Sequence, residues 1–374
     1  MKKQQSQNGK VLTPQKNFAH ARKALNEGLI ERAEEIDLVL TALIAQENCL
    51  LVGPPGTGKS FLLDSIMQWM GPGTNKFSIL FTKFTTPEEV FGPISIKGLK
   101  EDKYRRVTTG KLPEADISFI DEIFKGSSAI SNTTLKILNE RIFENGDGVF
   151  RKCPLRLCVA GSNEYPTDEG GKELGAMFDR FLLRKNVRPI ATKAGRQKLL
   201  WGGSHIPVFT HSISTQDIDF AHEWAISMPF MDEPTAMFEA IIEELNREGI
   251  RPGDRRMFKS VNAVKAYAYL CGADHVEPEH LSVLTHTLWD DPTEQPAKCA
   301  QVVARIANPI GMAINDFLLQ IESVMSTAEP TRAVQELKSI QKKLNDLKPD
   351  PRKDDALAYV KQCIETCFNR VVNV

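Results

Sequence analysis

The sequence lacks a long apolar run and an excess of charge of either sign. No apolar stretch reaches the ~18 residues that a membrane-spanning helix requires, so we expect no association with a membrane. The 47 Lys and Arg residues balance 48 Asp and Glu residues, which gives a formal net charge of −1. Composition alone therefore does not point to nucleic acid or an anionic membrane. The basic N-terminus has no apolar core behind it, so we expect no secretory signal and a disordered tail over residues 1–17.

Paired cysteines are also absent. The seven cysteines form no C-x-x-C pair, and their number is odd. A structural zinc site normally uses such pairs and a disulfide framework an even number of cysteines, so the pattern favours a reduced cytoplasmic protein. Cys363 and Cys367 are four residues apart in a helical pattern. Core packing explains this spacing better than metal binding does.

A glycine-rich segment is present at residues 51–60, "LVGPPGTGKS", and it matches G-x-x-x-x-G-K-[ST]. An apolar run precedes it and a run with helical spacing follows, which predicts a strand, a phosphate-binding loop and a helix. Lys59 would reach the β- and γ-phosphates of ATP, and Ser60 would offer its hydroxyl to Mg²⁺. A plain turn, the alternative, needs neither residue. The predicted nucleotide-binding residues are Gly53, Pro54, Pro55, Gly56, Thr57, Gly58, Lys59, Ser60 and Phe61.

Acidic and amide side chains end two further apolar runs. Asp121 and Glu122 end the run 117–122, where Asp121 suits the Mg²⁺ shell and Glu122 suits deprotonation of an attacking water. A solvated strand end is the alternative, but adjacent acids favour a hydrolysing ATPase over a small-molecule kinase. Asn163 ends the run 155–163 and would hold the water or the γ-phosphate opposite Glu122, although Asn in this position is usually a turn former.

Four arginines are candidates for stabilising the charge on the transferred phosphoryl group. Arg180 and Arg184 lie before and within the fifth apolar run. Arg255 and Arg256 begin a helical pattern in "RPGDRRMF", from which one side chain would reach over the nucleotide. Surface ion pairs are the alternative explanation for the first two.

Apolar strands alternate with helices in the first half of the chain. Strands are expected at 48–52, 77–84, 117–122, 155–163 and 181–187, which predicts an α/β fold with a parallel five-stranded sheet between helices. After Pro189 only helices are expected, at about 193–201, 215–227, 232–248, 254–271, 277–288 and from 294 onward. Asp254 would cap one helix and Gly272 would end it. The predicted division is the tail 1–17, a nucleotide-binding domain 18–190, a helical domain 191–290 joined through a possible hinge at 201–209, and a C-terminal helical region 291–374.

Together these features resemble the AAA+ ATPases, and the MoxR family with its RavA-like branch most closely. The resemblance covers roughly residues 18–290 and includes the residues between the motifs. It is carried by "LLVGPPGTGKS", "FTTPEEVFGPISIKGLK", "GKLPEADISFIDEIFKGSSAISNTTLKILNER", "AGSNEYP", "MFDRFLLR" and "GDRR". Many relatives have alanine at the position of Gly58. The sequence also lacks the long discoidal extension of RavA proteins, so we carry over no role of that extension.

The resemblance implies a ring, usually a hexamer, in which a neighbouring subunit completes each active site. It implies that residues 191–290 form the lid. It assigns Lys59 as the Walker A lysine, Asp121 and Glu122 as the Walker B pair, Asn163 as sensor 1, Arg180 as the arginine finger and Arg255 as sensor 2. Arg184 and Arg256 remain the alternatives for the last two roles.

The resemblance also implies a chaperone that remodels a partner with a von Willebrand factor A (VWA) domain. No D-x-S-x-S motif of such a domain is present, so the partner would be a separate chain. A nucleic-acid motor is the rival hypothesis, favoured by "KGLKEDKYRR" at 97–106. We expect this segment to be a hairpin insertion, in which basic residues and Tyr104 would grip a single strand. Glu101 and Asp102 reduce the positive charge of this segment. We therefore favour a solvated or protein-contacting face over a nucleic-acid site. A scaffold without turnover is disfavoured by the intact Asp121 and Glu122.

Overall fold

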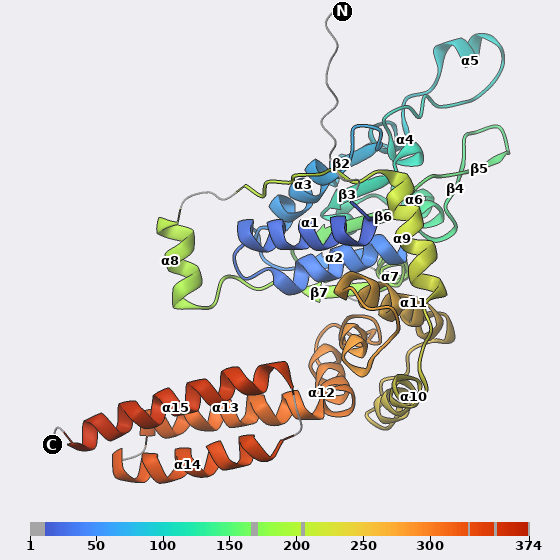
Figure 1. Ribbon diagram of the computed structural model, residues 1–374. Helices are drawn as coiled ribbons and strands as arrows, with labels where there is room; N and C mark the ends of the chain where they lie inside the picture. Colours follow the sequence, from blue (N-terminus) through green and yellow to red (C-terminus); the bar gives the residue numbers. More distant parts are fainter. Residues whose placement is uncertain (1–11, 166–170, 203–205, 328–329, 348–349, 373–374) are drawn as a thin grey trace, which may run out of the picture.

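The structure is a computed structural model that describes residues 12–165, 171–202, 206–327, 330–347 and 350–372. Five parallel strands form one sheet in the order β2-β3-β6-β1-β7, which confirms the predicted fold class (Figure 1). All residues of β1 and β6 are buried, as expected for a sheet covered on both faces. The strands are β1 Cys49–Val52, β2 Lys76–Leu80, β3 Ile117–Asp121, β6 Leu157–Ser162 and β7 Leu183–Asn186.

Helices α2 and α3 pack directly on this sheet. The first helix begins at Pro14, so the part of the predicted tail from residue 14 to 17 is helical, and Asn17 is buried. Two helices, separated by residues 29–32, precede the first strand. The helices of this part are α1 Pro14–Gly28, α2 Ala33–Ala45, α3 Lys59–Trp69, α4 Pro87–Phe91, α5 Ile96–Lys100, α6 Ser128–Glu140 and α7 Gly171–Phe178.

Two segments project beyond the sheet on the same side of the molecule (Figure 1). The first was predicted as a hairpin, and that prediction is wrong. Ser95 accepts a hydrogen bond from the Gly98 amide at 3.1 Å and starts the short helix α5, so only an isolated bridge between Ile94 and Arg106 remains. The second is an antiparallel hairpin of β4 Ile142–Glu144 and β5 Phe150–Lys152.

The chain after β7 is helical among the described residues, as predicted. Gly253 is the N-cap of α11, so the prediction that Asp254 caps this helix is wrong by one residue. Gly272 ends α11 with a φ of +88°, as expected. Residues 203–205 of the predicted hinge lie outside the described residues. The elements are α8 Lys193–Trp201, α9 Thr215–Ser227, α10 Asp232–Arg247, α11 Asp254–Cys271, the 3₁₀ segment η4 Pro278–His286 and α12 Gln295–Ala307.

The last three helices have an apolar core of their own, separate from the main one. They are α13 Pro309–Thr327, α14 Pro330–Asp346 and α15 Pro351–Val372, and they extend away from the sheet (Figure 1). Cys363 and Cys367 are buried in this core, and all seven cysteines are free. Core packing therefore accounts for this cysteine pair.

Among the helices that the structure describes, none alone has the length and apolar character to cross a membrane. One sharply bent pair, Gln295–Ala307 with Pro309–Met325, meets that test in length and composition only.

Candidate active site

The glycine-rich loop lies between the end of β1 and the start of α3. Gly56 and Gly58 have φ values of +78° and +84°, a region that glycine adopts without strain. A Cβ on Gly53 would lie 2.2 Å from the carbonyl oxygen of Val187, so only glycine fits there. The Gly53 amide donates to the Ser162 carbonyl at 3.0 Å, which fixes the loop to the neighbouring strand. The glycine-rich turn thus leads directly into the N-terminus of α3, whose free backbone N–H groups favour an anion such as phosphate.

Lys59 is the first residue of α3, and its side chain folds back over the loop. It is 7% exposed, and its ammonium group donates to the carbonyls of Gly53 and Pro54, the latter at 3.2 Å. Burial lowers the pKa of Lys59, while the nearby carboxylates of Asp121 and Glu122 raise it. These two carbonyls therefore hold the ammonium group at the loop. Ser60 and Phe61 follow it on the exposed first turn of α3.

Arg32 supports this loop from outside the motif, and sequence reasoning missed it. Its Nε atom donates to the carbonyl of Thr57 at 3.0 Å, and the residue is 7% exposed. The Thr57 hydroxyl in turn donates to the Pro54 carbonyl at 2.9 Å. Since the contact joins a side chain to a backbone atom 25 residues away, no local pattern signals it.

The predicted acids lie where β3 ends, at the same edge of the sheet as the loop. The Asp121 carboxylate accepts from the Glu122 amide at 3.0 Å, and Glu122 has a φ of +53°. A Cβ on Gly161 of β6 would lie 2.5 Å from Asp121 Oδ1, so glycine on the neighbouring strand leaves room for this carboxylate. The Glu122 carboxylate accepts from the Asn163 amide and contacts Lys125 Nζ at 3.3 Å. Four predicted residues, Lys59, Asp121, Glu122 and Asn163, therefore converge.

Arg180 lies at the opposite edge of the sheet. Its backbone carbonyl accepts from the side chain of Asn48 at 3.2 Å, and Asn48 immediately precedes β1. The four residues of β1 span about 13 Å between that point and the phosphate loop. The Arg180 guanidinium contacts Asp179 at 3.2 Å and is 28% exposed, and its Nε atom has no partner among the described residues. Arg180 is thus remote from its own loop, and its predicted role needs a second subunit.

Arg184 is buried inside its own chain, which removes it as an alternative finger. Its side chain is 1% exposed and donates to the carbonyls of Phe181, Trp289 and Phe178. The guanidinium lies 3.9 Å from the centre of the Phe178 ring. Burial, with the charge of Arg256 beside it, lowers the pKa of Arg184 to about 9.

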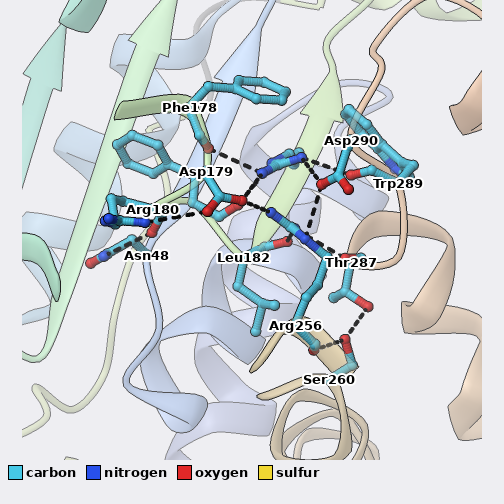
Figure 2. Close-up of polar contacts among 12 residues, drawn as sticks. Asn48, Phe178, Asp179, Arg180, Leu182, Arg256, Ser260, Thr287, Trp289 and Asp290 are labelled. Carbon is cyan, nitrogen blue, oxygen red and sulfur yellow. Dashed lines mark hydrogen bonds and ion pairs between the residues drawn. The ribbon is translucent and has the colours of Figure 1, made fainter. Parts of the chain in front are cut away.

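Of the two lid arginines, Arg256 is internal and Arg255 is exposed. Arg256 pairs with Asp179 at 2.8 Å and with Asp290 at 3.2 Å, which ties α11 to the segment before β7 (Figure 2). Arg255 donates to Asn139 at the end of α6. The adjacent Leu138 carbonyl accepts from Asn48 at 3.0 Å, so Arg255 lies near the edge where β1 begins. Neither Arg180 nor Arg255 is brought to the phosphate loop of its own chain, and their roles stay predictions.

Two family models match the chain. A model of the MoxR domain in MoxR-vWA-beta-propeller ternary systems matches residues 16–222, more than half of the chain. A model of an AAA lid domain matches residues 235–303.

Similar proteins occur in an archaeon and an archaeal virus. Uncharacterized protein MJ0812 of Methanocaldococcus jannaschii is 40% identical over 274 residues, which are 73% of this chain and 71% of the relative. Uncharacterized protein MJ0079 of the same organism is 41% identical over 271 residues, 72% and 69% of the two chains. Structural protein ORF618 of Acidianus two-tailed virus is 31% identical over 163 residues, 43% and 26% of the two chains.

A solved structure shares the fold. The crystal structure of a candidate ATPase from Cytophaga hutchinsonii has a TM-score of 0.62 at 14% identity, and the match covers 79% of this chain and 95% of that one. At this identity the likeness concerns the fold alone. The family models go further, because one covers the loop, the acids and Asn163, and the other covers the following helices. The chain therefore belongs to the MoxR family of AAA ATPases.

Proposed function

We propose that the chain hydrolyses ATP to ADP and phosphate. The observation that carries this is the meeting of Lys59, Glu122 and Asn163 at one edge of the sheet. The loop N–H groups and Lys59 bind the phosphates, and Glu122, held by Asn163, takes the proton of the attacking water. Ser60 and Asp121 offer oxygen atoms, the ligand type that Mg²⁺ prefers, and the ion would neutralise charge on the phosphates.

The active copy is part of a ring, with a hexamer as the expected size. Arg180 and Arg255 lie at the edge of the sheet where β1 begins, while the phosphates bind where it ends. A neighbouring copy would complete the site if its Arg180 and Arg255 faced this phosphate loop. We also propose that the chain belongs to the RavA-like branch, because its motifs and the residues between them resemble those of that branch.

The ring acts as a chaperone or remodeller of a separate VWA-domain protein. The matching family model describes MoxR domains that occur with vWA and beta-propeller partners, which supports this choice. The free thiols of all seven cysteines suit a reducing compartment, and we propose the cytoplasm.

A nucleic-acid motor is the second candidate, because one observation favours it. Lys97, Lys100 and Arg105 are exposed on the projecting segment that contains α5. Arg106 does not belong to this group, since it pairs with Glu88 at 3.1 Å and donates to the Gly92 carbonyl. Basic side chains with a nearby Tyr are typical of a single-strand groove.

ATPase rates decide between the two candidates. Phosphate release is measured for the wild type alone, with single-stranded DNA, and with the VWA protein encoded nearest to this chain. We expect stimulation by the protein and none by DNA. Replacing Lys97, Lys100 and Arg105 with Ser should leave the basal rate intact. The control replaces Lys338, Lys342 and Lys343 on α14, which are also exposed. DNA stimulation that the first variant loses and the control keeps would favour the motor.

A further inference from the structure

Asn48 lies immediately before β1, at the opposite end of this strand from the phosphate loop. The residue is 2% exposed. Its side-chain nitrogen donates to two backbone carbonyls, that of Leu138 at 3.0 Å and that of Arg180 at 3.2 Å. Its side-chain oxygen accepts from the Arg141 guanidinium at 3.1 Å. A buried polar group that is satisfied in this way holds its partners in one arrangement.

The two carbonyls belong to the segments that carry the two exposed arginines of the predicted site. Arg180 is the predicted finger itself. Leu138 precedes Asn139, whose side chain accepts from Arg255. The two carbonyls lie 90 and 132 residues after Asn48 in the sequence. One buried side chain is therefore a common support for both arginine-bearing segments.

Asn48 holds the backbone around Arg180 at two points. Besides the side-chain bond to the Arg180 carbonyl, the backbone carbonyl of Asn48 accepts from the Leu183 amide at 3.3 Å. Phe181, which lies between them, is fully buried. The Arg180 guanidinium is held less tightly, because it pairs with the half-exposed Asp179 at 3.2 Å (Figure 2). The direction in which the Arg180 side chain leaves the backbone thus depends on Asn48.

We propose that Asn48 is a positioning residue for hydrolysis in the neighbouring copy. It holds Arg180, and the end of α6 that binds Arg255, in the orientation in which these arginines reach phosphates bound by the next subunit. This inference rests on the proposed function, in which Arg180 acts on a second copy. Asn48 acts through Arg180 rather than on the nucleotide of its own copy, because β1 separates it from its own phosphate loop by about 13 Å.

The first test replaces Asn48 with Ala in the full chain. We expect kcat to fall by up to about 100-fold, since displacement of a catalytic group by about 1 Å can cost 10²-fold. The affinity for a labelled ATP analogue should stay unchanged, because the phosphate loop is intact. Asn48→Ser keeps one donor and leaves a smaller cavity, so it should show the same pattern with a smaller loss. It also keeps the test open if Asn48→Ala does not fold.

Asn17→Ala is a matched control for the loss of a buried amide. Asn17 is 6% exposed, donates to the Ser212 carbonyl at 2.9 Å and accepts from the Trp69 indole at 3.2 Å. It therefore joins distant segments as Asn48 does, but contacts neither arginine-bearing segment. Asn17→Ala should lower stability and keep the wild-type kcat at a temperature at which it is folded.

Mixing of variants tests the direction of the defect. Asn48→Ala mixed with Lys59→Ala should recover ATPase activity, since the first copy supplies an intact phosphate loop and the second a well-placed Arg180. Asn48→Ala mixed with Arg180→Ala should stay at its low rate, because neither copy then presents a well-placed Arg180. The same pair of mixtures applies to Asn48→Ser.

The reverse pattern would show that Asn48 supports its own phosphate loop through β1, and it would overturn the proposal. Recovery in both mixtures, recovery in neither, or a wild-type kcat for Asn48→Ala and Asn48→Ser would overturn it as well. Loss of assembly in sedimentation velocity for both variants would assign Asn48 a structural role instead.

A mixture of Lys59→Ala with Arg180→Ala is the reference for the proposed function. If this reference recovers activity while the Asn48 mixtures do not follow the expected pattern, the shared active site stands and the role of Asn48 falls. If the reference co-assembles and stays inactive, the shared active site is contradicted, and the role of Asn48 falls with it. The two failures therefore give different results.

Discussion

The side-chain amide of Asn163 donates a hydrogen bond to the carboxylate of Glu122. The two residues follow neighbouring parallel strands, β6 and β3, so the sheet itself brings them together. Glu122 is 7% exposed. A buried carboxylate held by an amide is positioned to accept a proton from water, and its neighbour fixes its direction.

Changing Glu122 to Gln should abolish most hydrolysis and keep ATP binding. The amide keeps the shape of the side chain and loses its basicity, and general-base contributions are typically ~10²–10⁴-fold. Phosphate release gives the rate, and titration with a labelled ATP analogue gives the affinity. A variant that turns over at the wild-type rate would show that Glu122 is not the base.

Changing Lys59 to Ala should weaken ATP binding about 10- to 100-fold, because a hydrogen bond to a charged group contributes about 1.5–3 kcal/mol. The ammonium group already sits on the carbonyls of the loop. Lys125 is a matched control, since its Nζ lies 3.3 Å from Glu122 but outside the loop. The same titration applied to Lys125→Ala should give near-normal affinity. Equal losses in both variants would argue that general charge, rather than Lys59, binds the phosphates.

Changing Arg184 to Met should lower the free energy of unfolding by about 1–3 kcal/mol, because it leaves buried backbone carbonyls without their donor. Arg184 donates hydrogen bonds to three backbone carbonyls. Its guanidinium nitrogens lie 3.7 Å and 3.6 Å from carboxylate oxygens of Asp179 and Asp290. Arg180→Met, which removes a more exposed ion pair, should cost less than about 1 kcal/mol. Urea unfolding at pH 7 measures both. Similar losses for the two variants would contradict the structural role given to Arg184.

The free energy of unfolding should fall in mild acid because of His286. Burial and the nearby charge of Lys185 lower the pKa of His286 from 6.5 to about 4. Between these two pH values the unfolded chain binds more protons than the folded one, so the free energy of unfolding falls as pH falls. The slope from this group is at most about 1.4 kcal/mol per pH unit. Urea midpoints at pH 6.5 and pH 5 should converge in His286→Asn, and an unchanged difference would locate the effect elsewhere.

The sheet and the catalytic edge were predictable because their signals are local. Apolar runs ending in Gly53, Asp121 and Asn163 gave the strands and their carboxyl ends, and a parallel sheet then places those ends together. The support of the loop by Arg32 and the burial of Arg184 were not predictable, because each depends on atoms distant in the sequence.

The hairpin expected at residues 97–106 was wrong for a different reason, because the signal for the helix is local. The Ser95 hydroxyl accepts from the Gly98 amide three residues further on, an N-cap that begins α5.

Sharing of one active site between two copies is the central claim, and a mixing experiment tests it most directly. Lys59→Ala has a defective pocket and an intact Arg180, whereas Arg180→Ala has an intact pocket and no finger. Each alone should be nearly inactive, since a finger in trans contributes ~10³–10⁵-fold in related systems. Mixed at equal concentration, they should recover part of the wild-type ATPase rate. A mixture that co-assembles, as sedimentation would show, and yet stays inactive would contradict the claim.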